Sequence, residues 1–227
     1  MPFLHGSNVG PACTTLALDF SVVQRLSRTL IQLNIATRPH HAAADQPWLD
    51  LMAPRVERAR YRALLLKVYG FEAPLDSGFR YTPELASLID LRGRTRTGLL
   101  AQDLMRLGLT ASQMAQLPQR FTTFATAAEA LGWMYVIERA TLLHSSVRRH
   151  LMVRCPDLAP ATSYLDAYNG VTSLRWAELG AAFDSIAHTP SVLRQILNAA
   201  NVGFRAMRDW FHELAMERGS RLKHSVA

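Results

Sequence analysis

Apolar and polar residues alternate along most of the chain with the period of an α-helix. In residues 20–38, apolar side chains recur every three or four positions, as on one helical face: Val22, Leu26, Leu30 and Leu33. The same pattern predicts further helices over residues 54–76, 96–109, 110–117, 126–152, 173–187 and 189–219. No run alternates with the period of two that is typical of a strand bounded by turns. The sequence therefore predicts an all-α fold of roughly seven to nine helices.

The 227 residues fit one domain, and nearly half of them are apolar, which is enough for a large buried core. We expect a single helical bundle over residues 21–218. Residues 1–20 are expected to form a loosely ordered segment. Gly219 is expected to end the last helix, which leaves residues 219–227 as a basic tail.

Composition narrows the class of function. The two cysteines, Cys13 and Cys155, support neither a disulfide framework nor a zinc site and are typical of a reducing compartment. No stretch has the ~20 consecutive apolar residues of a membrane span, and the N-terminus lacks a secretory pattern. The net charge is +7, but the arginines are scattered and form no stripe for nucleic acid. We expect a cytoplasmic protein that binds neither nucleic acid nor membrane.

Two adjacent histidines stand out in the stretch ATRPHHAAAD, residues 36–45. Neighbouring positions on a helix point about 100° apart, so His40 and His41 cannot both face one ligand. Pro39 either kinks the helix or restarts it, with Thr37 as the cap. From this stretch alone, each histidine is either a packed or capping residue or a metal ligand.

The stretch resembles the proximal-helix motif of the haem oxygenase family, in which an Ala-Thr pair, a basic residue and two further positions precede the histidine that binds haem iron. His41 has the ligand position, Arg38 the basic position and Asp45 the acidic position that follows. Four further segments are similar to the family in the same order: residues 61–76, 99–109, 130–138 and 183–211. The resemblance covers most of residues 30–211.

The resemblance implies an all-α bundle that holds haem between a proximal and a distal helix. It implies cleavage of haem by O2 to biliverdin, carbon monoxide and iron, with electrons from a ferredoxin or an NAD(P)H-dependent reductase. The bilin product could be passed to a phytochrome. Residues expected to contact haem besides the iron ligand are Thr37, Arg38, Met134, Arg175 and Phe204, with the two arginines as partners for the propionates.

The distal helix departs from the family. Active members have glycines after the motif Gly-x-x-Tyr-Val-x-Glu, which let the backbone lie against haem. Here the matching residues run from Arg139 to His144, and none is glycine. Arg139, Ala140, Leu143 and His144 would form the distal wall. Three outcomes stay open: altered oxygenation, haem ligated by both His41 and His144 as in a sensor or carrier, or a scaffold that binds no haem.

Overall fold

The computed structural model describes residues 27–224, with side chains described up to His212. Within that span there are ten α-helices and no strand, so the all-α class is confirmed. The helices are α1 (Arg28–Leu49), α2 (Arg58–Arg80), α3 (Leu85–Leu88), α4 (Thr97–Arg106), α5 (Ala111–Ala115), α6 (Ala127–Arg139), α7 (Thr141–Arg154), α8 (Ser163–Asp166), α9 (Thr172–Ile186) and α10 (Pro190–His224). Three 3₁₀ turns lie at Asp50–Met52, Arg92–Arg94 and Pro156–Ala161. None of these helices is long and apolar enough to cross a membrane.

The first described helix runs unbroken through both of its prolines. Ser27 caps α1, because its Oγ accepts a hydrogen bond from the N–H of Leu30 at 3.1 Å. The carboxylate of Asp184 in α9 accepts bonds from the hydroxyls of Ser27 and Thr29 at 2.9 and 2.8 Å. Of the two alternatives at Pro39, a kink or a restart with Thr37 as the cap, the restart is therefore wrong: Thr37 is buried in mid-helix and donates its hydroxyl proton to the carbonyl of Leu33.

The segment expected as one helix over residues 126–152 is divided in two. The helix α6 ends at Arg139 and α7 begins at Thr141, so Ala140 marks a break without glycine or proline. The hydroxyl of Thr141 donates to the carbonyl of Glu138 at 2.6 Å, which satisfies one of the carbonyls that the end of α6 leaves free.

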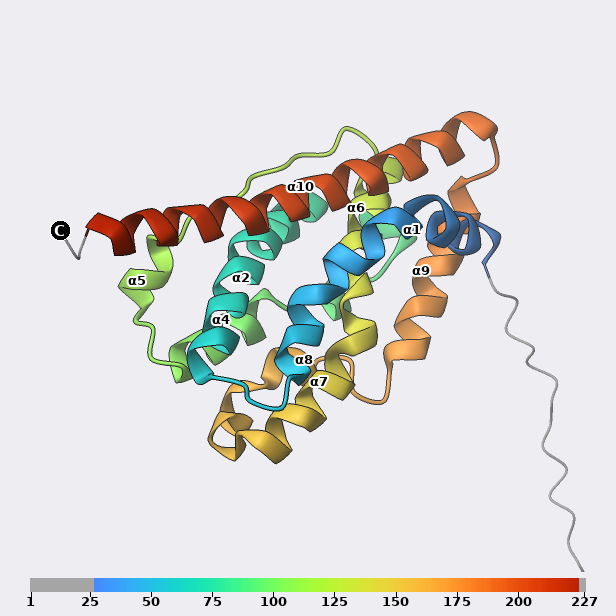
Figure 1. Ribbon diagram of the computed structural model, residues 1–227. Helices are drawn as coiled ribbons and strands as arrows, with labels where there is room; N and C mark the ends of the chain where they lie inside the picture. The colour runs from blue at the N-terminus through green and yellow to red at the C-terminus, as the bar shows by residue number, and fades with distance from the viewer. Residues whose placement is uncertain (1–26, 225–227) are drawn as a thin grey trace, which may run out of the picture.

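Helix α6 lies at the centre of the bundle and packs along α10, which crosses the whole length of the molecule (Figure 1). A Cβ at Gly132 would lie 2.7 Å from the carbonyl oxygen of Ile196, so only glycine permits this approach of α6 to α10. The end expected at Gly219 is wrong, because α10 continues to His224. The expected N-terminal segment, residues 1–20, lies outside the described residues.

A network of buried charges holds the C-terminal end of α6. The carboxylate of Glu138 lies 3.4 Å from guanidinium nitrogens of both Arg94 and Arg96, and it accepts the hydroxyl proton of Tyr168 at 2.8 Å. Arg96 also lies 3.4 Å from Glu72. All five side chains are buried, so each charge depends on its neighbours rather than on water. The network fixes Glu138, two residues before Ala140 at the α6–α7 break.

Candidate haem site

His41 lies on the face of α1 that is turned toward α6. Its Nε2 is 3.0 Å from the hydroxyl oxygen of Thr37, one turn earlier, and that oxygen is 3.5 Å from the hydroxyl of Tyr135 in α6. The hydroxyl proton of Thr37 goes to the carbonyl of Leu33, so the ring of His41 donates to Thr37. Burial lowers the pKa of His41 below its usual range, and the nearby charge of Arg139 lowers it further. The imidazole is thus neutral at neutral pH, the form that binds a metal.

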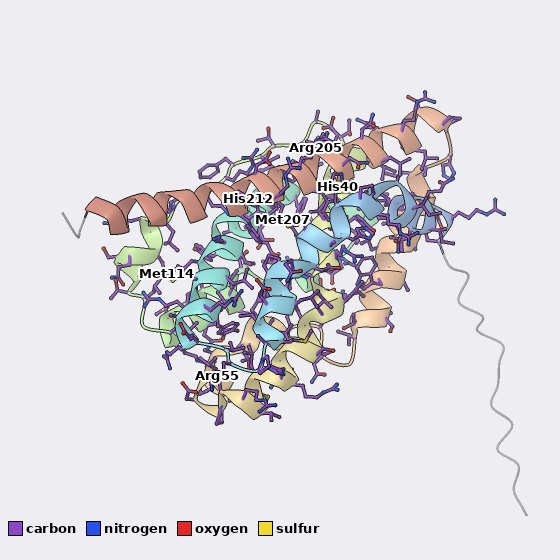
Figure 2. The ribbon with its side chains drawn as sticks, in the orientation of Figure 1. His40, Arg55, Met114, Arg205, Met207 and His212 are labelled. Atoms are coloured by element: carbon purple, nitrogen blue, oxygen red, sulfur yellow. The ribbon has the colours of Figure 1, made fainter. Side chains whose placement is uncertain are left out.

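His40 lies on a different face of α1 from His41, as the 100° spacing predicts. Its Nε2 lies 3.0 Å from Oδ1 of Asn201, and its ring stacks on Phe204 with centroids 5.6 Å apart. Figure 2 shows His40 beside α10, near Met207. Phe204 contacts both histidines, since its centroid is 5.9 Å from that of His41. The two imidazoles therefore have separate surroundings with one shared wall.

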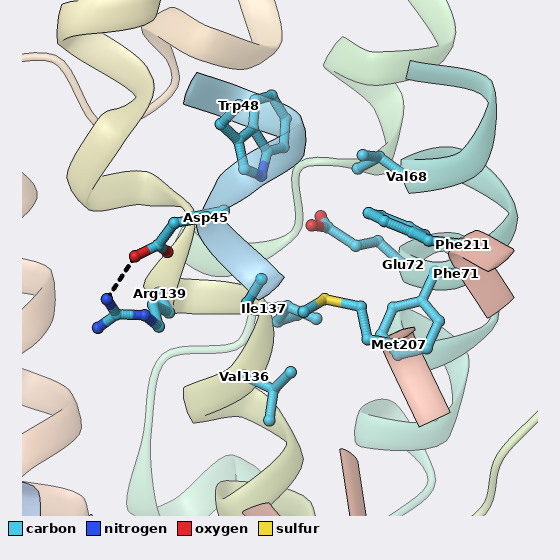
Figure 3. A pocket seen from close by; sticks show the side chains of 12 residues that line it. Asp45, Trp48, Val68, Phe71, Glu72, Val136, Ile137, Arg139, Met207 and Phe211 are labelled. Carbon is cyan, nitrogen blue, oxygen red and sulfur yellow. Dashed lines mark hydrogen bonds and ion pairs between the residues drawn. The ribbon is translucent and has the colours of Figure 1, made fainter. Parts of the chain in front are cut away.

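An ion pair joins α1 to the end of α6, one turn after His41. Asp45, one turn after His41, lies 2.7 Å from a guanidinium nitrogen of Arg139 at the end of α6, and both side chains are mostly buried (Figure 3). The cavity beside this pair has a volume of about 20 Å³, room for about one water molecule. Trp48, Glu72 and Phe211 are among the side chains around it (Figure 3).

Glu72 brings an unusual carboxyl group to this small cavity. Burial raises its pKa to about 7, although the charge of Arg96 and the hydroxyl of Tyr164 work in the opposite direction. The hydroxyl of Tyr164 donates to Glu72 at 2.7 Å. The cavity is therefore lined by a carboxyl group that is partly protonated near neutral pH, and by the Asp45–Arg139 ion pair.

His144 lies in the core rather than in open space. Its ring centroid is 4.9 Å from those of both Trp48 and Tyr164, and its Nε2 has no hydrogen-bond partner among the described residues. Burial holds the pKa of His144 well below its usual range, and Arg96 lowers it too. Leu143 is half-buried and packs against the same cluster. Of the expected distal wall, only Arg139 and Ala140 line the small cavity.

The structure brings together some of the expected haem contacts and separates others. Thr37 and Phe204 lie against His41, and Arg38 is exposed on the same helix. Arg175, at the start of α9, pairs with Asp90 and Glu178 at 3.3 and 3.0 Å, which ties it to the buried charge network. Met134 lines another small cavity, on the side of α6 that carries Glu138.

Sequence reasoning missed Tyr135 and Trp48. Tyr135 neighbours Met134 but takes the face of α6 that meets Thr37. It stands at the tyrosine position of the Gly-x-x-Tyr-Val-x-Glu segment, and that signal was available in the sequence. Trp48 is seven residues after His41, which is two turns along the same face of α1, so helical spacing alone could have placed it at the site.

The donor set fits haem, but the space needs to open. A neutral, half-buried imidazole beside an aromatic ring is a suitable ligand for haem iron. The small cavity beside the Asp45–Arg139 pair is not lined by His41, and it holds about one water molecule, far less than a porphyrin ring requires. Haem therefore fits this site only when α1 and the α6–α7 break move apart and the ion pair separates.

Comparisons with known proteins agree with this architecture. The sequence profile described as "Heme oxygenase" matches residues 27–213, which is most of the chain. No match is found among curated proteins. A solved structure of haem oxygenase from Neisseria meningitidis, crystallised with bound NO and CO, aligns with a TM-score of 0.60 at 19% sequence identity, over 82% of this chain and 90% of that one. At 19% identity the structural match supports the fold alone. The profile match over most of the chain shows that the chain belongs to the haem oxygenase family.

Proposed function

We propose that this protein binds haem with His41 as the iron ligand and cleaves the bound haem in an O2-dependent reaction to biliverdin, carbon monoxide and iron. The observation that carries the proposal is the neutral imidazole of His41, held on α1 between the contacts that Thr37 and Asp45 make with α6. Membership of the family supports it independently. Bound haem would supply both the iron that activates O2 and the ring that is oxidised.

The chain's own residues have separable tasks in this proposal. To hold haem iron, the Nε2 of His41 would have to leave the hydroxyl of Thr37 and give up its proton, so that the neutral ring carries its N–H on Nδ1 instead. Separation of the ion pair frees the carboxylate of Asp45, one turn away, to accept the Nδ1–H of His41 and so fix the ring. Phe204 packs against the imidazole, and the exposed Arg38 can meet a propionate.

Electrons must come from outside the chain, from a ferredoxin or an NAD(P)H-dependent reductase. The net charge of +7 suits an acidic donor, because complementary charges speed association. Turnover with such a donor should then fall steeply as ionic strength rises. Turnover that stays constant from low to high salt would argue against an electrostatic encounter. Supply of bilin to a phytochrome remains a further proposal.

A second candidate is haem binding without cleavage. It is favoured by the distal positions, where a side chain stands at each expected glycine and Arg139 reaches across to Asp45. Ligation by His144 would require its ring to leave the contacts with Trp48 and Tyr164. A low-spin spectrum that the substitution His144→Ala converts to a five-coordinate one would identify that state.

One experiment separates the two candidates. The full chain is loaded with one equivalent of haemin, and ascorbate is added in air while the visible spectrum is followed. Decay of the Soret band with the appearance of biliverdin, preserved in the presence of catalase, supports the oxygenase. A stable haem spectrum under the same conditions supports binding alone. Leu143→Gly/His144→Gly is the informative variant, since it restores two of the expected glycines.

A further inference from the structure

An open cavity lies between the second half of α7 and the turn that joins α8 to α9. Its volume is about 500 Å³, within the ~300–1,000 Å³ typical of small-molecule sites. Helices α7 and α8 lie side by side at this end of the bundle (Figure 1). Its lining includes none of the residues that contact His41 and none of those around the small cavity beside Asp45. The cavity is therefore separate from the proposed position of iron.

The turn between α8 and α9 forms one wall of this cavity and has a defined shape. The φ of Gly170 is +76°, a left-handed conformation that glycine adopts without strain. A Cβ at Gly170 would have nothing within 4 Å, so the space beside the turn is open. The hydroxyl of Thr172 donates to the carbonyl of Tyr168 at 2.9 Å, across the turn. The backbone therefore bounds the cavity without filling it.

Arg149 brings a positive charge to the cavity from α7. Arg148 also lines it, because both side chains are long enough to reach the cavity although neighbouring helix positions point about 100° apart. Arg149 is exposed, and within the part of the chain whose side chains are described it forms no ion pair and no side-chain hydrogen bond. Its guanidinium group is therefore available to an anion.

Arg148 uses only one edge of its guanidinium group inside the protein. Its Nε lies 3.4 Å from the carboxylate of Asp166, and the two side chains are 30% and 38% exposed. A pair as exposed as this contributes little to stability. The two Nη atoms of Arg148 have no partner among the described side chains and backbone groups. Asp166 is the one acidic residue in the lining, so two guanidinium groups against one carboxylate leave a net positive charge.

Neutral donors and apolar side chains complete the lining. Ser145 and Asn169 are exposed, and neither side chain forms a hydrogen bond within the described residues. Met152 and Val153 follow about one turn after the arginines on α7 and are 39% and 73% exposed. Leu165 lines the cavity from α8. Cations, neutral donors and an apolar surface thus meet in one cavity, as in a site for a small organic anion.

We infer that this cavity binds a small organic phosphate, whose phosphate group meets Arg148 and Arg149 and whose organic part lies on Met152, Val153 or Leu165. A phosphate monoester carries nearly two negative charges at neutral pH and three acceptor oxygens. These match two guanidinium groups with Ser145 and Asn169 beside them, since the fork of arginine suits phosphate oxygens. A carboxylate has one charge and two oxygens and would leave one of the arginines unpaired.

Isothermal titration calorimetry of the haem-free full chain tests the inference with three probes of similar size. Phenyl phosphate carries the phosphate group, benzoate carries a carboxylate, and phenol is neutral. Phenyl phosphate should bind saturably at one site per chain and at least several-fold more tightly than benzoate or phenol. Absence of saturable binding by phenyl phosphate would overturn the inference. Benzoate that binds as tightly as phenyl phosphate would show that the assignment to phosphate is wrong.

Two arginine substitutions on α7 separate the site from the general charge of the surface. Arg149→Met removes the unpaired cation that lines the cavity and should weaken phenyl phosphate about tenfold. Arg154→Met removes the charge of another exposed arginine, at the end of the same helix, which does not line the cavity. It should leave the affinity within about twofold of the parent. Equal losses in the two variants would show that phenyl phosphate responds only to net charge, and the site would be refuted.

A matched pair of tryptophan substitutions locates the organic part of the ligand. Ser145→Trp fills the cavity, whereas Ser146→Trp adds the same bulk at the neighbouring exposed position, which does not line it. We expect Ser145→Trp to weaken phenyl phosphate at least tenfold and Ser146→Trp to leave it unchanged, with both variants showing the helical circular dichroism of the parent. Equal effects of the two substitutions would contradict the placement in this cavity.

A lipid headgroup is the other source of a phosphate monoester. Phosphatidylcholine vesicles that contain phosphatidic acid should not sediment with the protein, and phenyl phosphate should bind without them. Co-sedimentation that Arg149→Met abolishes, with no binding of phenyl phosphate, would replace the small molecule by a lipid and overturn the inference. The inference does not rest on haem, so His41→Ala should bind phenyl phosphate within about twofold of the parent. A loss of phenyl phosphate binding in His41→Ala would contradict the separation of the two sites.

Discussion

Replacing Glu138 by glutamine tests whether buried charges hold the α6–α7 break in place. Glu138 is 1% exposed and faces guanidinium nitrogens of Arg94 and Arg96, each at 3.4 Å. Glutamine keeps the size of the side chain but removes its charge, so both buried cations lose a counter-ion. Removing one partner of a buried pair costs about 3–5 kcal/mol.

The structure places the expected loss near the lower end of that range. Arg94 keeps Glu178 at 3.2 Å, and Arg96 keeps Glu72, so neither cation is left without a carboxylate. We therefore expect Glu138→Gln to lower the free energy of unfolding by about 3 kcal/mol. In a chain of this size that corresponds to a fall in Tm of roughly 6–12 °C.

Urea unfolding followed by circular dichroism gives the free energy, and thermal unfolding gives the Tm. Asp209→Asn is the control, because it makes the same chemical change in the exposed pair with Arg208 and should cost less than about 0.5 kcal/mol. If Glu138→Gln lowers the free energy of unfolding by less than about 1 kcal/mol, or by no more than Asp209→Asn does, the view that this network holds the end of α6 in place is refuted.

Three further perturbations test other parts of the account. Glu72 has its folded pKa raised by burial from 4.5 to about 7, so the native state binds more protons than the unfolded state between these values. The stabilisation that comes from protonated Glu72 is present in full below pH 4.5 and is lost as the pH rises through about 7. The free energy of unfolding of the parent, measured with urea, should therefore fall by on the order of 3 kcal/mol relative to that of Glu72→Gln between about pH 5 and pH 8. A parallel pH dependence in the two proteins would contradict this. Arg139→Ala removes the 2.7 Å pair with Asp45, so stopped-flow mixing should show haemin binding several-fold faster, and an unchanged or slower rate would count against gating by that pair. Gly132→Ala should cost about 1–3 kcal/mol, because its Cβ would meet α10 at 2.7 Å, while Gly98→Ala, with nothing within 4 Å, should be neutral or stabilising.

The helical fold could be predicted from the sequence because helical periodicity is a local property. The positions of His40 and His41 on different faces of α1 follow from the same spacing. The family resemblance named His41 as the iron ligand, and the structure places its ring against Thr37 and Phe204. These predictions required no knowledge of which helices touch.

The parts that were missed depend on contacts between distant segments. Asp45 and Arg139 are 94 residues apart in the chain, and no spacing rule relates them. The choice between Met134 and Tyr135 as the residue facing α1 depends on the rotation of α6 in the bundle. Arg175 was expected to bind a propionate, but its guanidinium group pairs with Asp90, which is 85 residues earlier in the chain.

The measurement that tests the central claim most directly is a haemin titration of the full chain beside His41→Ala and His40→Ala. We predict a saturable Soret shift at one haem per chain for the parent and for His40→Ala. His41→Ala should lose the histidine-ligated spectrum and regain it when free imidazole is added. A spectrum of His41→Ala that matches the parent, or one lost only in His40→Ala, would contradict the account.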